Sequence, residues 1–171
     1  MDTATSYAGE ETLPRVGDDE RLMDEALSEA RLAAEAGDVP VGSVVVREGQ
    51  VVGRGRNRRE VDHDPTAHAE ILALREAAAA LGRWRLVDCA LYVTTEPCAM
   101  CAGAAILARI PLVVFAAPED KTGALRSTIE LFDDPRTTHR PKWRFGARRE
   151  QAKQLLTEFF ASRRGPREVA G

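Results

Sequence analysis

Two cysteines placed directly after an apolar run restrict the fold of this chain more than any other feature. The run ALYVTT at residues 90–95 predicts a buried strand, and Pro97, Cys98 and Cys101 follow it closely. Proline is tolerated in the first turn of a helix, so a helix is predicted to begin at Pro97, with both thiols on one face at positions i and i+3. The positive end of the helix dipole favours thiolate, and two adjacent thiolates favour zinc. The sequence therefore predicts a metal site just beyond the end of a strand.

Cysteine content and composition favour a cytoplasmic protein over a secreted one. The 171 residues include three cysteines, which form no even set, and the first residues have neither the basic start nor the apolar core of a secretory signal. In a reducing cytosol a disulfide between Cys98 and Cys101 is the weaker interpretation, although Cys-x-x-Cys can also be a redox pair. No apolar run reaches the roughly 18 residues that a membrane span needs, so we expect no membrane segment.

Helical and strand patterns alternate along the chain. Apolar residues at intervals of three and four predict an amphipathic helix from Asp19 to Gly37, and two valine-rich runs around Glu48-Gly49 predict a β-hairpin. The remaining predicted elements are a helix from Asp64-Pro65 to Gly82, a strand at 90–95, a helix from Pro97, a strand at 112–117, helical potential at 127–132, a possible strand at 142–146 and a helix at 148–164.

This order of elements predicts an α/β three-layer sandwich, in which helices flank a mixed central sheet of about five strands. Residues 1–18 are polar and show no period, so they are predicted to be a flexible N-terminal tail. Residues 19–164 are predicted to form a single domain, and residues 165–171 a C-terminal tail.

His68 is the best candidate for a third metal ligand. It lies in the first turns of a helix predicted to follow a strand, and open α/β sheets place their ligand sites at the carboxyl ends of such strands. Three protein ligands leave a fourth position for water, which makes a zinc site catalytic. Glu70 could carry protons to and from that water. However, two residues along an ideal helix separate side chains onto nearly opposite faces, so His68 must lie in a frayed first turn. In the structural alternative, His63 closes the site as a fourth ligand.

The combination of His-x-Glu with Pro-Cys-x-x-Cys resembles the signature of the zinc nucleobase deaminases. HDPTAHAE, TTEPCAMCAGA, DVPVG, Asn57 and KTGA are all similar to the bacterial tRNA-specific adenosine deaminases, of the zinc-dependent cytidine and deoxycytidylate deaminase superfamily. The resemblance covers roughly residues 19–164. It implies a cytidine-deaminase-like fold, a homodimer, one Zn²⁺ per subunit, and deamination of adenosine to inosine at the wobble position of a tRNA anticodon loop.

The resemblance also implies a role for each matching residue. His68, Cys98 and Cys101 would bind zinc, and Glu70 would shuttle the proton from water to the leaving amine. The residues on the substrate side would be Asn57, Val39, Pro40, Ala69, Glu119, Lys121 and His139 around the nucleoside, and Phe159, Arg163 and Arg164 on an RNA-facing helix.

Several positions depart from the pattern of the family. Ala116 and Arg126 stand where glycine is usual, Glu119 stands in place of aspartate, and Thr138 in place of asparagine. These are substrate-side positions, so two alternatives stay open: a deaminase of a free nucleobase or nucleoside of the guanine or cytosine type, and a non-catalytic, zinc-stabilised RNA-binding module.

Charge is unevenly distributed along the chain. Residues 136–171 hold ten basic and three acidic side chains, a net charge of +7, while residues 1–36 carry −7. A basic cluster is typical of nucleic-acid binding, but a solvated basic helix explains the same composition.

Overall fold

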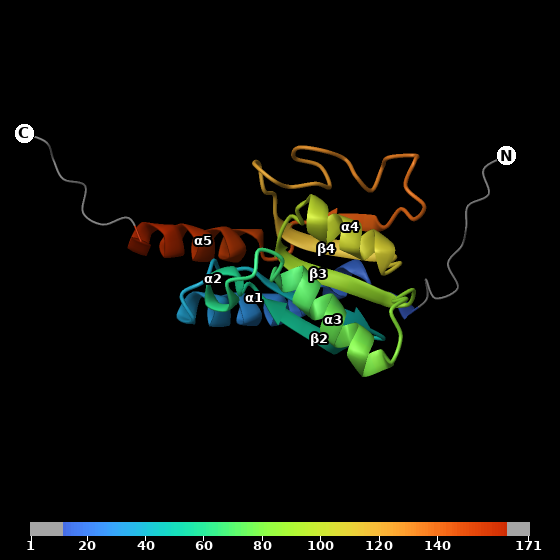
Figure 1. Cartoon of the computed structure of the whole chain (residues 1–171), viewed down its shortest axis with the longest axis horizontal. Coiled ribbons are helices and arrows are strands. Elements are labelled where there is room, and N and C mark those ends of the chain that lie inside the picture. The colour runs from blue at the N-terminus through green and yellow to red at the C-terminus, as the bar shows by residue number, and fades with distance from the viewer. Residues whose placement is uncertain (1–11, 164–171) are drawn as a thin grey trace, which may run out of the picture.

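The computed structural model describes residues 12–163, which form a five-stranded sheet between two layers of helices (Figure 1). In spatial order the strands are β2 (Gln50–Arg56), β1 (Gly42–Arg47), β3 (Cys89–Thr95), β4 (Leu112–Ala117) and β5 (Lys142–Phe145). β1 pairs antiparallel with β2 and with β3, whereas β3–β4 and β4–β5 are parallel. The predicted mixed sheet is therefore confirmed. Because β2 and β3 are both antiparallel to β1, they run in the same direction, and their carboxyl ends lie at the same edge of the sheet.

Each face of the sheet is covered by two of the longer helices. α1 (Asp19–Glu35) and α5 (Arg149–Arg163) pack on one face, and α3 (Ala69–Leu81) and α4 (Ala99–Leu107) on the other. The alternation of β1 decides which residues meet which layer. Val44 and Val46 join the cluster under α1, while Val45 joins the cluster under α3 and α4. The predicted three-layer sandwich is confirmed, and no helix among residues 12–163 is long and apolar enough to cross a membrane.

Two helices begin later than predicted. α3 starts at Ala69 instead of Asp64-Pro65, because Asp64 Oδ1 accepts hydrogen bonds from the backbone N and Oγ1 of Thr66 and closes a separate turn. α4 starts at Ala99, two residues after Pro97. A short helix, α2 (Arg59–Asp62), precedes this turn and was not predicted.

Two other segments also differ from the predictions. Residues 127–132 form turns instead of a helix, with Phe132 buried in the core. Residues 12–18 lie against the domain: Pro14 is buried, its carbonyl accepts a hydrogen bond from Arg144, and Val16–Asp18 form the short 3-10 helix η2. The other residues of the two predicted tails, 1–11 and 165–171, lie outside the described residues.

Candidate active site

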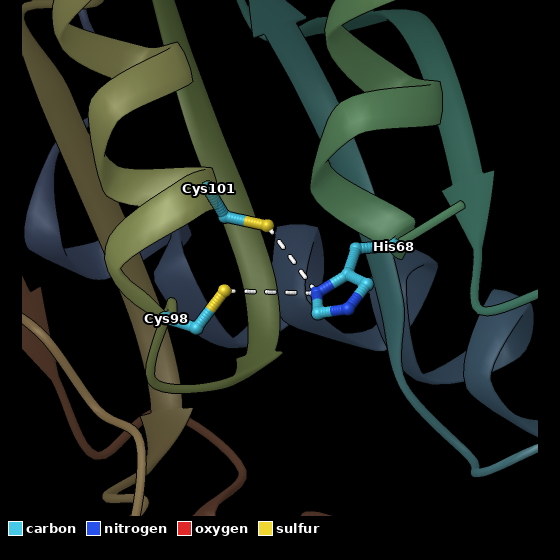
Figure 2. Close-up of side chains that lie close together, drawn as sticks. All are labelled: His68, Cys98 and Cys101. Atoms are coloured by element: carbon cyan, nitrogen blue, oxygen red, sulfur yellow. Dashed lines mark hydrogen bonds between the residues drawn. The ribbon is translucent and has the colours of Figure 1, made fainter. Parts of the chain in front are cut away.

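The three predicted metal ligands meet at one edge of the sheet (Figure 2). The Nδ1 atom of His68 lies 3.7 Å from Sγ of Cys98 and 3.5 Å from Sγ of Cys101. All three ligand atoms lie within 4.8 Å of one another. A soft thiolate pair with one imidazole is a donor set suited to zinc.

Helix ends position two of these ligands. His68 is the N-cap of α3 and Cys98 the N-cap of α4, and both have extended backbone angles. Each helix follows a strand whose carboxyl end lies at the same edge of the sheet, β2 for α3 and β3 for α4. The prediction that two helix N-termini converge there is confirmed.

The surroundings of Cys98 and Cys101 shift the pKa values of the two thiols in opposite directions. A hydrogen bond from Cys101 and, after it, the interaction with His68 outweigh the cost of burial and lower the pKa of the Cys98 thiol to about 3. The same hydrogen bond, together with burial, raises the pKa of Cys101. The lowered pKa of Cys98 favours the thiolate, which is the form that binds metal.

Glu70 lies on the same side of the site as the three ligands. Because His68 has an extended backbone and precedes the regular helix, the two-residue spacing no longer separates the two side chains. Glu70 is buried, and its Oε2 has no hydrogen-bond partner within residues 12–163. Burial raises the pKa of its carboxyl to about 7, which suits a group that accepts and donates protons near neutral pH.

His63 does not join the ligands. It is exposed at the end of α2 with a left-handed backbone (φ 51°), and the group within the described residues consists of His68, Cys98 and Cys101. The described residues thus bring together three candidate ligands and leave out the fourth ligand of the structural alternative.

A pocket of about 160 Å³ opens beside these residues. Its lining includes seven predicted site residues: Val39, Asn57, His68, Ala69, Glu70, Glu119 and Cys98. Pro40 is buried between two lining residues and does not line the pocket itself. Five lining residues were not predicted from the sequence: Val41, Arg59, Thr95, Glu96 and Thr122. All of them except Arg59 lie within the motifs DVPVG, TTEPCAMCAGA and KTGA, so membership of these motifs was the signal that could have found them.

Glu96 organises the pocket wall opposite α3. Its carboxylate accepts hydrogen bonds from the backbone N–H groups of Glu119, Leu125, Arg126 and Ser127 and from the hydroxyl of Ser127. Burial raises the pKa of Glu96, but these hydrogen bonds outweigh it, so the pKa is lowered overall. A charged carboxylate thus holds the 119–127 loop against the strand end that carries Cys98.

The structure separates His139 from the pocket. His139 is buried, and its Nε2 lies 2.6 Å from the carbonyl oxygen of Ile110, just before β4 begins. The pocket lies past the other end of the neighbouring β3. Because β4 has six residues at about 3.3 Å each, its ends are about 20 Å apart. His139 was predicted to contact the substrate, but its position and its contact with Ile110 indicate a structural role instead.

Lys121 and the α5 residues Phe159 and Arg163 are not among the residues that line the pocket. Lys121 is exposed, and its backbone N–H donates to Glu119 Oε1. Arg163 lies with its guanidinium 4.5 Å from the ring centre of Phe159 and donates a hydrogen bond to the carbonyl of Gly37. Phe159 is buried, which was not predicted for a residue that contacts RNA. Arg164 lies outside the described residues.

Comparisons with known proteins agree with this geometry. The family described as MafB19-like deaminase matches residues 17–164. A protein of Aquifex aeolicus (strain VF5) named tRNA-specific adenosine deaminase is 45% identical over 141 residues, which cover 82% of this chain and 93% of that protein.

Two solved structures extend the comparison. One comes from a study of A-to-I editing by tRNA:A34 deaminases at the wobble position of transfer RNA. It is 42% identical with a TM-score of 0.77, and the match covers 80% of this chain and 99% of that one. The guanine deaminase from Nitrosomonas europaea is 29% identical with a TM-score of 0.70, over 83% of this chain and 84% of that one. This chain therefore belongs to the MafB19-like deaminase family and groups with the tRNA-specific adenosine deaminases.

Proposed function

We propose that this protein hydrolytically deaminates adenosine to inosine at the wobble position of a tRNA anticodon, with residues 19–164 as its single catalytic domain. One observation carries the proposal: three zinc-type ligand atoms within 4.8 Å of one another share a pocket with a buried, unpartnered carboxylate oxygen of Glu70. The names of its relatives supply the substrate.

We propose that His68, Cys98 and Cys101 hold one zinc ion per subunit. Their donor set fits zinc, and the lowered pKa of Cys98 favours the thiolate that zinc binds. Zinc bound there would act as a Lewis acid that makes water a nucleophile at neutral pH.

Glu70 is the proton carrier in this proposal. Its pKa of about 7 lets the carboxylate accept a proton from the attacking water and donate it to the ring nitrogen. Glu70 then accepts the proton of the hydroxyl that water has added to the ring carbon and donates it to the amine, which leaves as ammonia. The reaction balances, because water supplies the oxygen that replaces the amine and ammonia leaves. Asn57, Val39 and Ala69 line the pocket and are proposed to hold the base, with Pro40 supporting Val39.

The RNA strand is proposed to reach the pocket along a basic rim. Arg59 is exposed and lines the pocket, and Lys121 is an exposed residue next to Thr122, which also lines it. Further out, α5 ends in Arg163, followed by Arg164, in a segment of net charge +7. If these side chains contact phosphate, tRNA affinity falls with salt at a log–log slope of roughly −0.7 per contact with single-stranded RNA.

A homodimer is proposed to form across the outer surface of α3 and α4. An apolar groove of about 450 Å³ lies there, lined by residues that include Ile71, Leu74, Trp84 and Leu107. Trp84 is 60% exposed and Leu107 73% exposed, and apolar patches of this kind mark protein interfaces. A second copy is the occupant that the tRNA deaminase resemblance implies. We also propose that the protein acts in the cytoplasm, where its tRNA substrate is found.

Ammonia release separates the candidate functions. The purified zinc-loaded protein is given unmodified tRNA, guanine, cytosine or adenosine at matched concentrations. A tRNA deaminase releases ammonia fastest from tRNA. Faster release from guanine or cytosine would favour the free-base alternative, and no release from any substrate would favour the RNA-binding module.

A further inference from the structure

Asp38 lies beneath the pocket wall and does not line the pocket. Its side chain is fully buried in the turn between α1 and β1. Oδ1 accepts hydrogen bonds from the backbone N of Val39 (2.9 Å) and from Nδ2 of Asn57 (3.0 Å). Oδ2 accepts hydrogen bonds from the backbone N of Glu60 (2.8 Å) and of Val61 (3.3 Å). One carboxylate therefore joins the turn that holds Val39 to the segment that holds Asn57.

The bond to Asp38 determines which way the amide of Asn57 faces. An ionised carboxylate can only accept hydrogen bonds, so the nitrogen of the amide must be the atom that faces Asp38. The amide oxygen is then directed away from Asp38. Asn57 is 6% exposed and lines the pocket, and its Oδ1 has no hydrogen-bond partner within residues 12–163.

A buried acceptor without a partner costs free energy that a bound ligand can recover. We propose that Asp38 is a positioning residue that holds the Asn57 amide with its oxygen toward the substrate, and that the substrate supplies a hydrogen-bond donor to this oxygen. The identity of the donor rests on the proposed function. On adenosine within an RNA chain the donors are the 6-amino group and the ribose 2′-hydroxyl. The ring nitrogens of neutral adenine only accept.

A double-mutant cycle tests whether Asp38 acts through Asn57. Asp38→Asn keeps the shape of the side chain but no longer dictates the orientation of the facing amide. We expect Asp38→Asn to lower kcat/KM on an anticodon stem-loop by about 10- to 100-fold, the range of one disrupted buried hydrogen bond. In an Asn57→Ala background the same change should cost little more, because the amide that it positions is gone. Equal losses in both backgrounds would overturn the positioning role.

Stability is measured on the same variants, together with zinc content. If Asp38→Asn does not fold, Asp38→Glu replaces it in the cycle, since it keeps the carboxylate but displaces it. Asp62→Asn is the matched control. Asp62 is an exposed aspartate that follows Glu60 and Val61, the residues bound by Asp38, and its own carboxylate pairs with Arg58. It should leave kcat/KM unchanged.

The donor is identified with a stem-loop that carries 2′-deoxyadenosine at the target position. If the 2′-hydroxyl is the donor, Asn57→Ala costs nothing further on this substrate. If the 6-amino group is the donor, the full cost of Asn57→Ala remains. An Asn57→Ala protein with normal kcat/KM on both stem-loops would overturn the donor assignment. Should the protein act on guanine instead of tRNA, the proposed function fails, but the Asp38–Asn57 cycle is still decided on guanine.

Discussion

The carboxylate of Glu96 lies so close to the backbone of Gly123 that a Cβ atom there would be 2.5 Å from Glu96 Oε2. Gly123 also forms a backbone bridge with Cys98, and the next residue, Ala124, donates its N–H to the carbonyl of Pro97. The loop that forms one wall of the pocket is thus attached to the metal-ligand segment by glycine, which alone leaves room for Glu96.

Gly123→Ala is predicted to destabilise the protein by about 1–3 kcal/mol, the range for overpacking a tight site. Because the displaced loop carries Glu119 and Thr122, kcat/KM should fall as well. Gly103→Ala in α4 is the control: a Cβ there meets nothing within 4 Å, so stability should rise by about 0.5–1 kcal/mol. Chemical denaturation measures both. Equal stability of the two variants would contradict the packing argument.

Cys98→Ala is predicted to abolish zinc binding and activity, since it removes the thiolate of the ligand set. Cys89→Ala serves as the thiol control, because Cys89 is buried at the start of β3, outside the ligand group. Elemental analysis by mass spectrometry should find one zinc per chain in the wild type and in Cys89→Ala. An active wild-type protein that contains no zinc would refute the metal assignment.

Glu70→Gln is predicted to keep the fold and the zinc but to lose about 10²–10⁴-fold in kcat, the usual contribution of proton transfer. Glutamine has almost the same shape but cannot carry the proton. Glu76→Gln changes an exposed residue of the same helix and should leave kcat unchanged. Single-turnover kinetics give the comparison. Near-normal turnover in Glu70→Gln would remove Glu70 from the mechanism.

Leu107→Asp is predicted to shift the protein from dimer to monomer, because it places a charge in the apolar groove of α3 and α4. Leu32→Asp makes the same change at a residue of α1 that is 42% exposed and lies outside that groove. Light scattering after size-exclusion chromatography reports the mass of each variant. A wild-type monomer, or a Leu107→Asp dimer, would exclude this interface.

Local patterns in the sequence predicted most of the fold. The apolar periodicity of α1, the valine-rich hairpin and the apolar strands β3 and β4 each report burial directly, so these elements were found. The helix starts were less accurate. Asp64-Pro65 is a common start signal for helices, but here Asp64 binds Thr66 and closes a turn, which leaves His68 to cap the helix.

The candidate metal ligands could be predicted because Cys98 and Cys101 are close in sequence, and His68, although 30 residues before Cys98, belongs to a recognisable His-x-Glu motif. Glu96 could not be predicted in the same way. Its partners Leu125, Arg126 and Ser127 lie about thirty residues further along the chain, and only the folded loop brings their N–H groups to one carboxylate. The prediction for His139 failed for a related reason. Its segment has no regular sequence pattern, and only the folded structure shows that its side chain contacts the carbonyl of Ile110.

Mapping of inosine in tRNA tests whether the protein deaminates adenosine at the wobble position. The purified protein is incubated with an anticodon stem-loop that has adenosine at the wobble position and at other loop positions, and the product is sequenced by mass spectrometry. We predict inosine at the wobble position, one ammonia released per inosine formed, and neither product with Glu70→Gln. A stem-loop that keeps every adenosine, under conditions in which the same protein deaminates guanine, would contradict this prediction.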